Sequence, residues 1–277
     1  MVSIPENVSL EVIIVDNDST DITRDVVMDY VKRQDHIFRY IFERSRGKSF
    51  ALNTGIKEAS GEIIAFTDDD CIPRRNWVAT MSREFRQDPS LLGIGGRVEP
   101  YSENDVKDTT RTSRQSFCLS ETNLNVANPP IIGCNMSFRI ETFEKAGDFD
   151  TDLGPGCRGA SGGEDMDFVY RAFKTGLKIC YAPEVVVYHN HGRTTKESKV
   201  EKENRELRGR GAFYFKHMLK LDLVVCRFAY WEMRGLLRNL LRKLISAQSP
   251  REELFCLSGL AGGFFYKAKV SLRRLLV

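Results

Sequence analysis

The chain has 277 residues, of which 42% are apolar and 29% are charged. This length suits one large domain or two modest ones, and the apolar fraction is typical of a globular protein. A net charge of +3 is too small to indicate a nucleic-acid-binding protein, and no nucleic acid is expected as a partner.

The charge is distributed unevenly along the chain. Residues 203–277 contain 15 lysines and arginines against 6 aspartates and glutamates, which leaves 26 against 32 in residues 1–202. We therefore expect an acidic body over residues 1–202 and a basic helical region over residues 203–277. A basic region of this kind predicts an anionic surface as its partner.

The seven cysteines are scattered, odd in number and free of CxxC pairs. This usage predicts reduced thiols in a cytoplasmic protein, with no disulfide framework and no zinc site. The first residues lack the charged start and apolar core of a signal peptide. The longest apolar stretch near the C-terminus, Leu254 to Tyr266, is shorter than the roughly 18 residues of a membrane-spanning helix.

Apolar runs and helical patterns alternate over the first hundred residues. The runs predict strands at 10–15, 38–42, 63–66 and 92–98, and the periodicity predicts helices at 22–31, 50–59 and 77–85. Such alternation is typical of an α/β fold with a parallel sheet and helices on both faces. Ligands bind in such folds beyond the carboxyl ends of the strands.

Acidic clusters follow two of these strands. Asp16 and Asp18 come after the first strand, and Asp68, Asp69 and Asp70 come after the third. Adjacent carboxylates repel one another, and a divalent cation placed between them and an anionic ligand relieves that repulsion. The alternative is an acidic turn in water, but the position of both clusters at strand ends favours a ligand site.

The middle of the chain contains a polar segment and a glycine-rich segment. Residues 101–128 are ambiguous, with a helix or long loop around Thr112 to Leu119, and residues 140–146 predict a short helix. Five glycines between Asp148 and Gly163 predict either a mobile loop over an active site or an ordinary surface loop. Glu164 and Asp165 then open a helix, where carboxylates also serve as simple caps.

Two of the four histidines follow a strand pattern. Strands are predicted at 177–181 and 185–188, separated by Pro183, and His189 and His191 come directly afterwards. Residues two apart share a face if the strand continues. A lone histidine is usually structural, but this pair, in a chain with an aspartate cluster, is a candidate set of metal ligands.

The region from Asn204 onward is helical, basic and aromatic. An apolar stripe at 236, 237, 240, 241 and 244 runs beside Arg234, Arg238, Arg242 and Lys243. This composition is typical of a helix that lies in a membrane surface. A helix packed on the body with its arginines in water has the same pattern, and periodicity does not separate the two.

Six segments, taken together, resemble the family 2 glycosyltransferases with a GT-A fold. They are LEVIIVDNDSTD, GKSFALNTGI, GEIIAFTDDDC, IIGCNMSFRIETFEKAGDFD, GGEDMDFVYR and YAPEVVVYHNH, in the family's order from Leu10 to His191. The resemblance implies a mixed, mainly parallel sheet flanked by helices, with a C-terminal helical extension. It also implies that the strand, turn and helix that precede the VIIVDN strand in the family are absent from this chain.

On the donor side, the resemblance places Asp16 and Asp18 near the base and ribose of a nucleotide sugar. Asp68, Asp69 and Asp70 resemble the family's DxD element. Asp68 would contact the nucleoside, and Asp70 would hold Mn²⁺ or Mg²⁺ against the diphosphate, with His189 or His191 completing the metal site or contacting the diphosphate. Lys48, after Gly47, is a further candidate for the diphosphate, although a lysine in a solvated turn is the more common case.

On the acceptor side, the resemblance makes Asp165 the general base and Glu164 a residue that orients the acceptor. It implies an inverting, metal-dependent transfer from a nucleotide-diphosphate sugar, with uridine as the expected base, to a hydroxyl of a glycan, lipid-linked or other acceptor. The expected location is the cytoplasm, with peripheral contact at the inner face of the cell membrane. The alternative is an inactive relative that binds a nucleotide or a partner.

Overall fold

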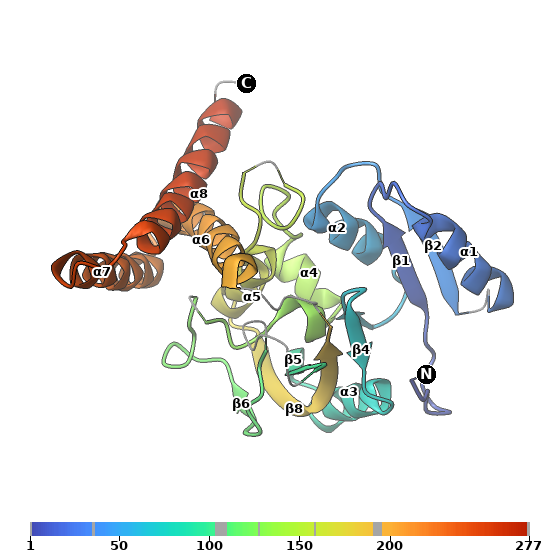
Figure 1. Cartoon of the computed structure of the whole chain (residues 1–277). Coiled ribbons are helices and arrows are strands. Elements are labelled where there is room, and N and C mark those ends of the chain that lie inside the picture. The colour runs from blue at the N-terminus through green and yellow to red at the C-terminus, as the bar shows by residue number, and fades with distance from the viewer. Residues whose placement is uncertain are drawn as a thin grey trace.

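The predicted alternation of strands and helices is confirmed in the first hundred residues. A computed structural model describes residues 2–34, 37–102, 110–126, 128–157, 159–190 and 196–275 (Figure 1). The N-terminal elements are β1 (Val12–Asp16), α1 (Thr23–Arg33), β2 (Phe38–Phe42), α2 (Lys48–Glu58), β3 (Ile63–Phe66), β4 (Cys71–Pro73), α3 (Trp77–Gln87) and β5 (Leu91–Pro100). The sequence did not indicate β4, because three residues ending in proline carry no periodicity.

The second half of the chain contains shorter strands and longer helices. Its elements are β6 (Phe117–Cys118), the 3₁₀ turn η2 (Gly133–Asn135), β7 (Met136–Arg139), α4 (Glu141–Ala146), α5 (Glu164–Lys174), β8 (Lys178–His189), α6 (Lys196–Met218), α7 (Leu223–Ile245) and α8 (Arg251–Leu275). Helix α6 spans the boundary expected at residues 202 and 203, and the division into two domains stays a prediction.

The strands form two sheets, of which the larger is mixed in direction. Strands β1 and β2 make a parallel pair, and the larger sheet has the order β3-β7-β5-β8-β4, with β6 also paired to β8. Within the described residues, β5–β8 is the other parallel pair, whereas β3–β7, β5–β7, β4–β8 and β6–β8 are antiparallel. The mixed sheet is confirmed, and antiparallel pairs outnumber parallel ones among the described strands because β4, β6 and β7 each run against the strands beside them.

Strand β8 is continuous, which corrects the prediction of two strands separated by Pro183. The register against β5 shifts between Gly96 and Arg97, and Pro183 lies in the part of β8 that this irregularity bypasses. The Nε of Arg97 donates a hydrogen bond to the carbonyl of Pro183 at 2.9 Å. A proline fits inside a sheet at such an irregularity, since no ladder hydrogen bond is required of its nitrogen.

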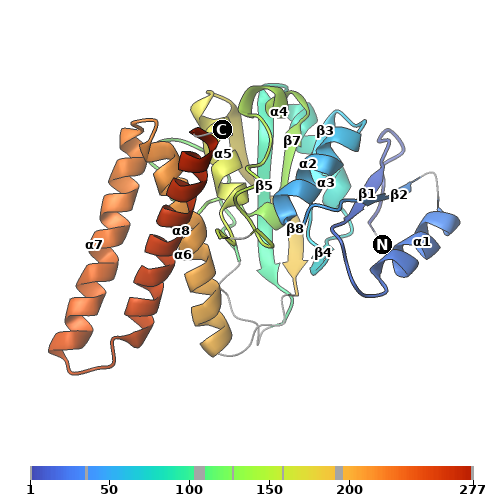
Figure 2. The same cartoon turned by 90° about the horizontal axis from the view of Figure 1, so that it is seen from above.

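Helices cover both faces of the larger sheet. Helix α3 packs on one face through Trp77, Val78, Met81 and Phe85. Helices α4 and α5 pack on the other face, where Phe143 and Phe168 stack with ring centroids 5.0 Å apart. Figure 2 shows the sheet between the β1–β2 unit on one side and the C-terminal helices on the other. The buried rings on α5 fix the position of its first turn, where Glu164 and Asp165 lie.

The cysteines depart from the prediction that all are reduced. Cys118 and Cys180 form a disulfide, while the other five cysteines are free. The bond links β6 to β8, where Cys118 lies opposite Cys180 in an antiparallel pair. The two residues are 62 positions apart in sequence, so their spacing gave no sign that tertiary folding would bring them together.

The C-terminal helices are tied to α5 and to each other. Helix α6 crosses α8 closely, because Gly263 leaves no side chain to meet the carbonyl of Arg208. Asp222 caps α7 by accepting from Val224 N–H, and the hydroxyl of Tyr170 on α5 donates to the same carboxylate at 2.7 Å. In the described residues, no helix is both long and apolar enough to cross a membrane.

Candidate active site

A polar cavity of about 560 Å³ lies beyond the carboxyl end of β1. Residues 17–21 line it together with Arg46, Gly47 and Gly156. Asn17 organises this corner: its side-chain amide donates to the carbonyl of Ser45 at 2.7 Å and its side-chain oxygen accepts from Gly47 N–H at 2.7 Å. The turn after β1 and the start of α2 are thereby joined into one wall of the cavity.

Asp16 and Asp18 play different parts in this wall. Asp16 is buried, and its carboxylate accepts hydrogen bonds from Ser19 N–H and from the hydroxyl of Tyr40 at 2.7 Å. Burial opposes its charge, yet these hydrogen bonds hold the pKa of Asp16 below its ordinary value. Asp18 is half-exposed, has a left-handed backbone with φ of 59°, and pairs with Arg46 at 2.8 Å. Asp16 therefore shapes the turn, while Asp18 and Arg46 face the cavity.

Lys48 joins the acidic turn after β3 to the start of α5. Its Nζ lies 2.7 and 2.8 Å from the two carboxylate oxygens of Asp68, and 4.0 Å from Oε1 of Glu164. Burial opposes its charge, but the carboxylates of Asp68 and Glu164 raise the pKa of Lys48 above its ordinary value. Lys48 begins α2 and is not a lysine in a solvated turn. The sequence had favoured the solvated alternative.

Asp165 lies beside this group on the first turn of α5. Its carboxylate accepts from Gly133 N–H at 2.8 Å and from Met166 N–H at 2.7 Å. A Cβ on Gly133 would lie 3.0 Å from the Asp165 carboxylate, so a glycine lets η2 approach closely. Burial raises the pKa of Asp165, although Lys48 and these hydrogen bonds oppose the rise.

Glu164 is buried and has little compensation for a negative charge. Burial and the neighbouring charge of Asp165 raise the pKa of Glu164 to about 7, against the opposing effect of Lys48. A carboxyl group of this kind exchanges a proton near neutral pH, which suits general acid–base chemistry. Glu164 and Asp165 are thus two neighbouring carboxyl groups. Among the described residues, Lys48 is the one permanent cation close to them.

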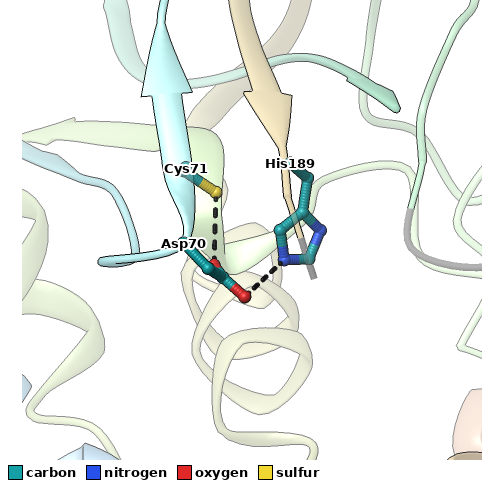
Figure 3. A group of neighbouring side chains, drawn as sticks. All are labelled: Asp70, Cys71 and His189. Atoms are coloured by element: carbon teal, nitrogen blue, oxygen red, sulfur yellow. Dashed lines mark hydrogen bonds and ion pairs between the residues drawn. The ribbon is translucent and has the colours of Figure 1, made fainter. Parts of the chain in front are cut away.

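A candidate metal site lies where β4 meets the end of β8 (Figure 3). Oδ2 of Asp70 is 3.1 Å from Nε2 of His189, and the Cys71 thiol is 3.7 Å from Oδ1 of Asp70. These three side chains offer ligand atoms that all lie within 4.8 Å of one another. The pairing of Cys71 with His189 across β4 and β8 brings them together.

Two donors of this site, the Asp70 carboxylate and the His189 imidazole, fit a divalent transition metal, whereas a cysteine thiolate is a softer ligand. Carboxylate oxygen suits Mg²⁺ and Mn²⁺, and an imidazole nitrogen moves the preference from Mg²⁺ toward a metal such as Mn²⁺. Asp70 keeps 39% of its side chain exposed, which leaves room for a ligand from solvent or substrate. Asp69 is exposed between Asp68 and Asp70, and His191 lies outside the described residues.

Two cysteines lie between the group of charges around Lys48 and the candidate metal site of Asp70 and His189. A hydrogen bond with Cys71, together with burial, raises the pKa of the Cys134 thiol. Cys134 follows Gly133, whose N–H binds Asp165, and Cys71 follows Asp70. The structure therefore brings together the predicted residues Lys48, Asp68, Asp70, Glu164, Asp165 and His189.

Three residues that the sequence analysis did not single out help to build the site. Asn17 lies between two named aspartates, and its amide joins two loops. Gly133 holds Asp165, and Cys71 packs between Asp70 and Cys134. Position next to a named residue was the one available signal for Asn17 and Cys71, while Gly133 had none.

Solved structures place this architecture in a known fold class. The chain resembles the mannosyltransferase PcManGT from Pyrobaculum calidifontis, solved with GDP-Man and Mn²⁺, with a TM-score of 0.58 and 20% identity over 95% of this chain and 78% of that one. It also resembles S. aureus TarS 1–349 in complex with UDP-GlcNAc, with a TM-score of 0.56 and 16% identity over 79% and 62% of the two chains. These two likenesses show that the chain has a GT-A fold.

Sequence relatives identify the family within that class. The model of glycosyl transferase family 2 matches residues 6–147, slightly more than half of the chain, and the chain belongs to this family. Glycosyltransferase AglE of Haloferax volcanii is 30% identical over 183 residues, which are 65% of this chain and 56% of AglE.

A second relative, from Methanococcus voltae, is 27% identical over 190 residues, which are 64% of this chain and 56% of the relative. It is the dolichyl N-acetyl-alpha-D-glucosaminyl phosphate 3-beta-D-2,3-diacetamido-2,3-dideoxy-beta-D-glucuronosyltransferase. The chain thus spans about half the length of these two curated relatives.

Proposed function

We propose that this protein transfers a sugar from a uridine-diphosphate sugar to an acceptor hydroxyl, with inversion at the anomeric carbon and with a divalent metal. The observation that carries the proposal is the convergence of donor-side and acceptor-side residues on Lys48. Its Nζ bonds to Asp68 at 2.7 Å and lies 4.0 Å from Glu164, the neighbour of Asp165. An anionic donor and a hydroxyl acceptor would meet in this cleft.

On the donor side, the cavity lined by residues 17–21 would receive the nucleoside, with Asp18 and Arg46 at its wall. Asp68 and Asp69 would bind the donor, and Lys48 would turn from Asp68 toward the diphosphate. Asp70 and His189 would hold Mn²⁺ or Mg²⁺, and His191 stays a predicted ligand. When bound, such a metal supplies Lewis-acid stabilisation of the charge that develops on the leaving diphosphate.

On the acceptor side, Asp165 would remove the proton from the attacking hydroxyl. Its raised pKa makes it a better base at neutral pH than an exposed aspartate, and two backbone N–H groups hold its carboxylate in place. Glu164 would orient the acceptor through a hydrogen bond. A single displacement with a base opposite the leaving group inverts the sugar, so no nucleophilic side chain is required.

The relatives support the proposed substrate classes. PcManGT was solved in complex with GDP-Man and TarS 1–349 in complex with UDP-GlcNAc, so nucleotide sugars bind to similar folds. The name of the M. voltae relative describes transfer to a dolichyl-phosphate-linked sugar. We accordingly propose a glycan or lipid-linked hydroxyl as the acceptor.

The same proposal includes a location at the inner, cytoplasmic face of the cell membrane. The basic excess of residues 203–277, with 15 cationic against 6 anionic side chains, supports peripheral contact with an anionic surface. A lipid-linked acceptor would lie in that surface.

A second candidate is a protein that binds the nucleotide without transferring a sugar. In the described part of the chain, β1 pairs with β2 alone and β3 pairs with β7 alone, so the nucleotide side and the larger sheet are not joined by a ladder. Reduced rigidity between them would weaken catalysis more than binding, because catalysis requires the tighter geometry.

Calorimetry and a transfer assay together test the two candidates. Uridine diphosphate should bind in the presence of Mn²⁺ and should bind much more weakly after chelation, and a uridine-diphosphate sugar should be consumed when a lipid-linked or glycan acceptor is added. Metal-dependent binding with no transfer to any acceptor would favour the second candidate. Absence of binding to any nucleoside diphosphate would contradict both.

A further inference from the structure

Helix α7 carries apolar side chains on two sides. On one side, Val225 is buried, and Phe228, Ala229 and Leu236 pack against the cluster that includes Phe213 and Tyr214. This side follows the i, i+3, i+4, i+7 spacing of a helix face that packs on a protein core. The packing alternative for the basic helical region is therefore realised, but it accounts for one side of α7 only.

A second apolar stripe lies on another side of the helix, which faces outward. Its members are Tyr230, Met233, Leu237, Leu241 and Leu244, which recur at helical spacing and are all exposed. Leu241 and Tyr230 each have 57% of their surface exposed. Among the described residues, no other element covers this stripe, and Figure 2 shows α7 as the outermost of the three C-terminal helices.

The exposed charges beside this stripe are all positive. Arg227, Arg234, Arg238 and Arg242 are exposed along the neighbouring side of α7. The one acidic residue of α7, Glu232, faces inward, where it accepts hydrogen bonds from Arg210 at 2.8 Å and from Tyr214 at 2.5 Å. An occupant of the outer side would therefore face apolar groups and uncompensated arginines.

This combination distinguishes between the possible occupants. A second copy of the chain, bound through the same stripe, would bring arginines against arginines, which opposes association. An anionic bilayer instead offers apolar depth for the leucines and phosphate groups for the guanidinium groups. Tyr230 and the exposed Trp231 suit the headgroup level of a bilayer, and the guanidinium of Arg234 lies over the Trp231 ring at 5.4 Å.

We propose that the outer side of α7, defined by Tyr230, Met233, Leu237, Leu241 and Leu244 with Arg227, Arg234, Arg238 and Arg242, docks on an anionic phospholipid bilayer. Helix α7 lies along the bilayer surface, with its leucines below the headgroups and its inner side still packed on α6 and α8. The proposal deepens the membrane location proposed above and is independent of the transfer reaction.

Vesicle pelleting of the full chain tests this proposal without any donor or acceptor. The chain should pellet with vesicles that contain phosphatidylglycerol and should pellet much less with vesicles of phosphatidylcholine alone. Leu237→Ser/Leu241→Ser should lower the partition coefficient at least tenfold. Arg234→Gln/Arg238→Gln should lower it about thirtyfold at low salt, since each basic residue near an anionic surface adds about a factor of five.

Matched controls use exposed residues on α1 and α3, away from the C-terminal helices. Val26→Ser/Tyr30→Ser on α1 and Arg83→Gln/Arg86→Gln on α3 remove similar side chains from exposed positions, and both should pellet like the wild type. Equal pelleting of all variants, or equal pelleting with both lipids, would overturn the proposal. A concentration-dependent dimer that Leu237→Ser/Leu241→Ser abolishes would also overturn it, because the stripe would then bind a second copy.

Because pelleting requires no sugar transfer, its failure leaves the proposed reaction standing, and loss of transfer leaves the docking result standing. Urea unfolding of both α7 variants should match that of the wild type, since the substituted side chains are exposed. If one double variant unfolds at a lower urea concentration than the wild type, the other double variant serves as the test. Either pair alone is sufficient to contradict lipid docking if it pellets unchanged.

Discussion

Two groups of charged side chains lie on and beside helix α5, and they differ in the balance of negative and positive charge. The cleft cluster consists of Asp68, Glu164 and Asp165 around Lys48, so three acids share one lysine. The anchor cluster ties the loop before α5, and α5 itself, to α6 and α8. In it, three acids meet five cationic or protonatable groups: Asp150, Asp152 and Asp167 with Lys216, Lys267, Arg171, Arg274 and His217.

The difference appears in neighbouring carboxyl groups. Burial opposes the charge of Asp167, but His217, Lys216 and Arg171 hold its pKa well below the ordinary value. Three residues earlier on the same helix, burial raises the pKa of Glu164 to about 7. The anchor cluster is complete within the chain and serves stability, whereas the cleft cluster lacks positive charge and is suited to receive it from a ligand or metal.

Asp165→Asn is expected to have the largest effect on activity. The amide keeps the shape of the side chain but cannot take a proton from the acceptor, so transfer should fall by about 100- to 10,000-fold. Affinity for uridine diphosphate with Mn²⁺, measured by calorimetry, should stay within about threefold of the wild type, because donor contacts lie elsewhere. Undiminished turnover would contradict the role of Asp165 as base.

Lys267→Met should cause the largest loss of stability in the anchor cluster. Lys267 has 5% of its side chain exposed and lies 2.7 Å from both Asp150 and Asp152. Its removal leaves two partly buried carboxylates short of positive charge, so the free energy of unfolding should fall by about 3–5 kcal/mol. Urea unfolding followed by circular dichroism measures this, and a change near zero would mean that the cluster is not an anchor.

The pH dependence of stability separates the two clusters. The pKa of Glu164 is raised from 4.5 to about 7, so the folded protein holds more protons than the unfolded chain in that window, and Glu164 makes stability fall as pH rises. This contribution is at most about 1.4 kcal/mol per pH unit. Glu164→Gln should remove it, and urea unfolding between about pH 5 and pH 7 measures the difference in slope.

If Glu164→Gln leaves the slope of the unfolding free energy against pH unchanged, the group that titrates in this range is not Glu164. The anchor cluster predicts the opposite sign: Asp150, whose pKa the neighbouring Lys216 and Lys267 lower against the effect of burial, stabilises the fold above pH 4 and loses that effect as pH falls. The Asp150→Asn variant should therefore lose stability at neutral pH and approach the wild type in acid.

Arg274→Ala should have the smallest effect and is the matched control for Lys267→Met. Arg274 binds the same carboxylate of Asp152, at 3.0 Å, but 63% of its side chain is exposed. Exposed ion pairs contribute little because water and salt screen them, so the free energy of unfolding should fall by no more than about 1 kcal/mol. A loss as large as that of Lys267→Met would mean that exposure does not govern the strength of these pairs.

Much of the candidate site could be predicted from the sequence. The acidic turns after β1 and β3, Glu164 and Asp165 at the start of α5, and His189 at the end of β8 all lie where the pattern of strand ends and helix starts predicted them. The role of Lys48 was harder to predict from the sequence, because a lysine after a glycine in a polar turn is usually solvated. Its pairing with Asp68, 20 residues away in sequence, depends on how α2 packs beside β3.

The sequence by itself determined the order of most strands and helices, the family, and the acidic residues of the site, because apolar periodicity and strand-end position are local properties. Tertiary structure alone decided that β4, β6 and β7 enter the sheet antiparallel, that Cys118 meets Cys180, and that Gly133 holds Asp165. It also decided that one side of α7 packs while the other stays exposed. These outcomes depend on which distant segments the fold brings into contact, and no local pattern of residues records that.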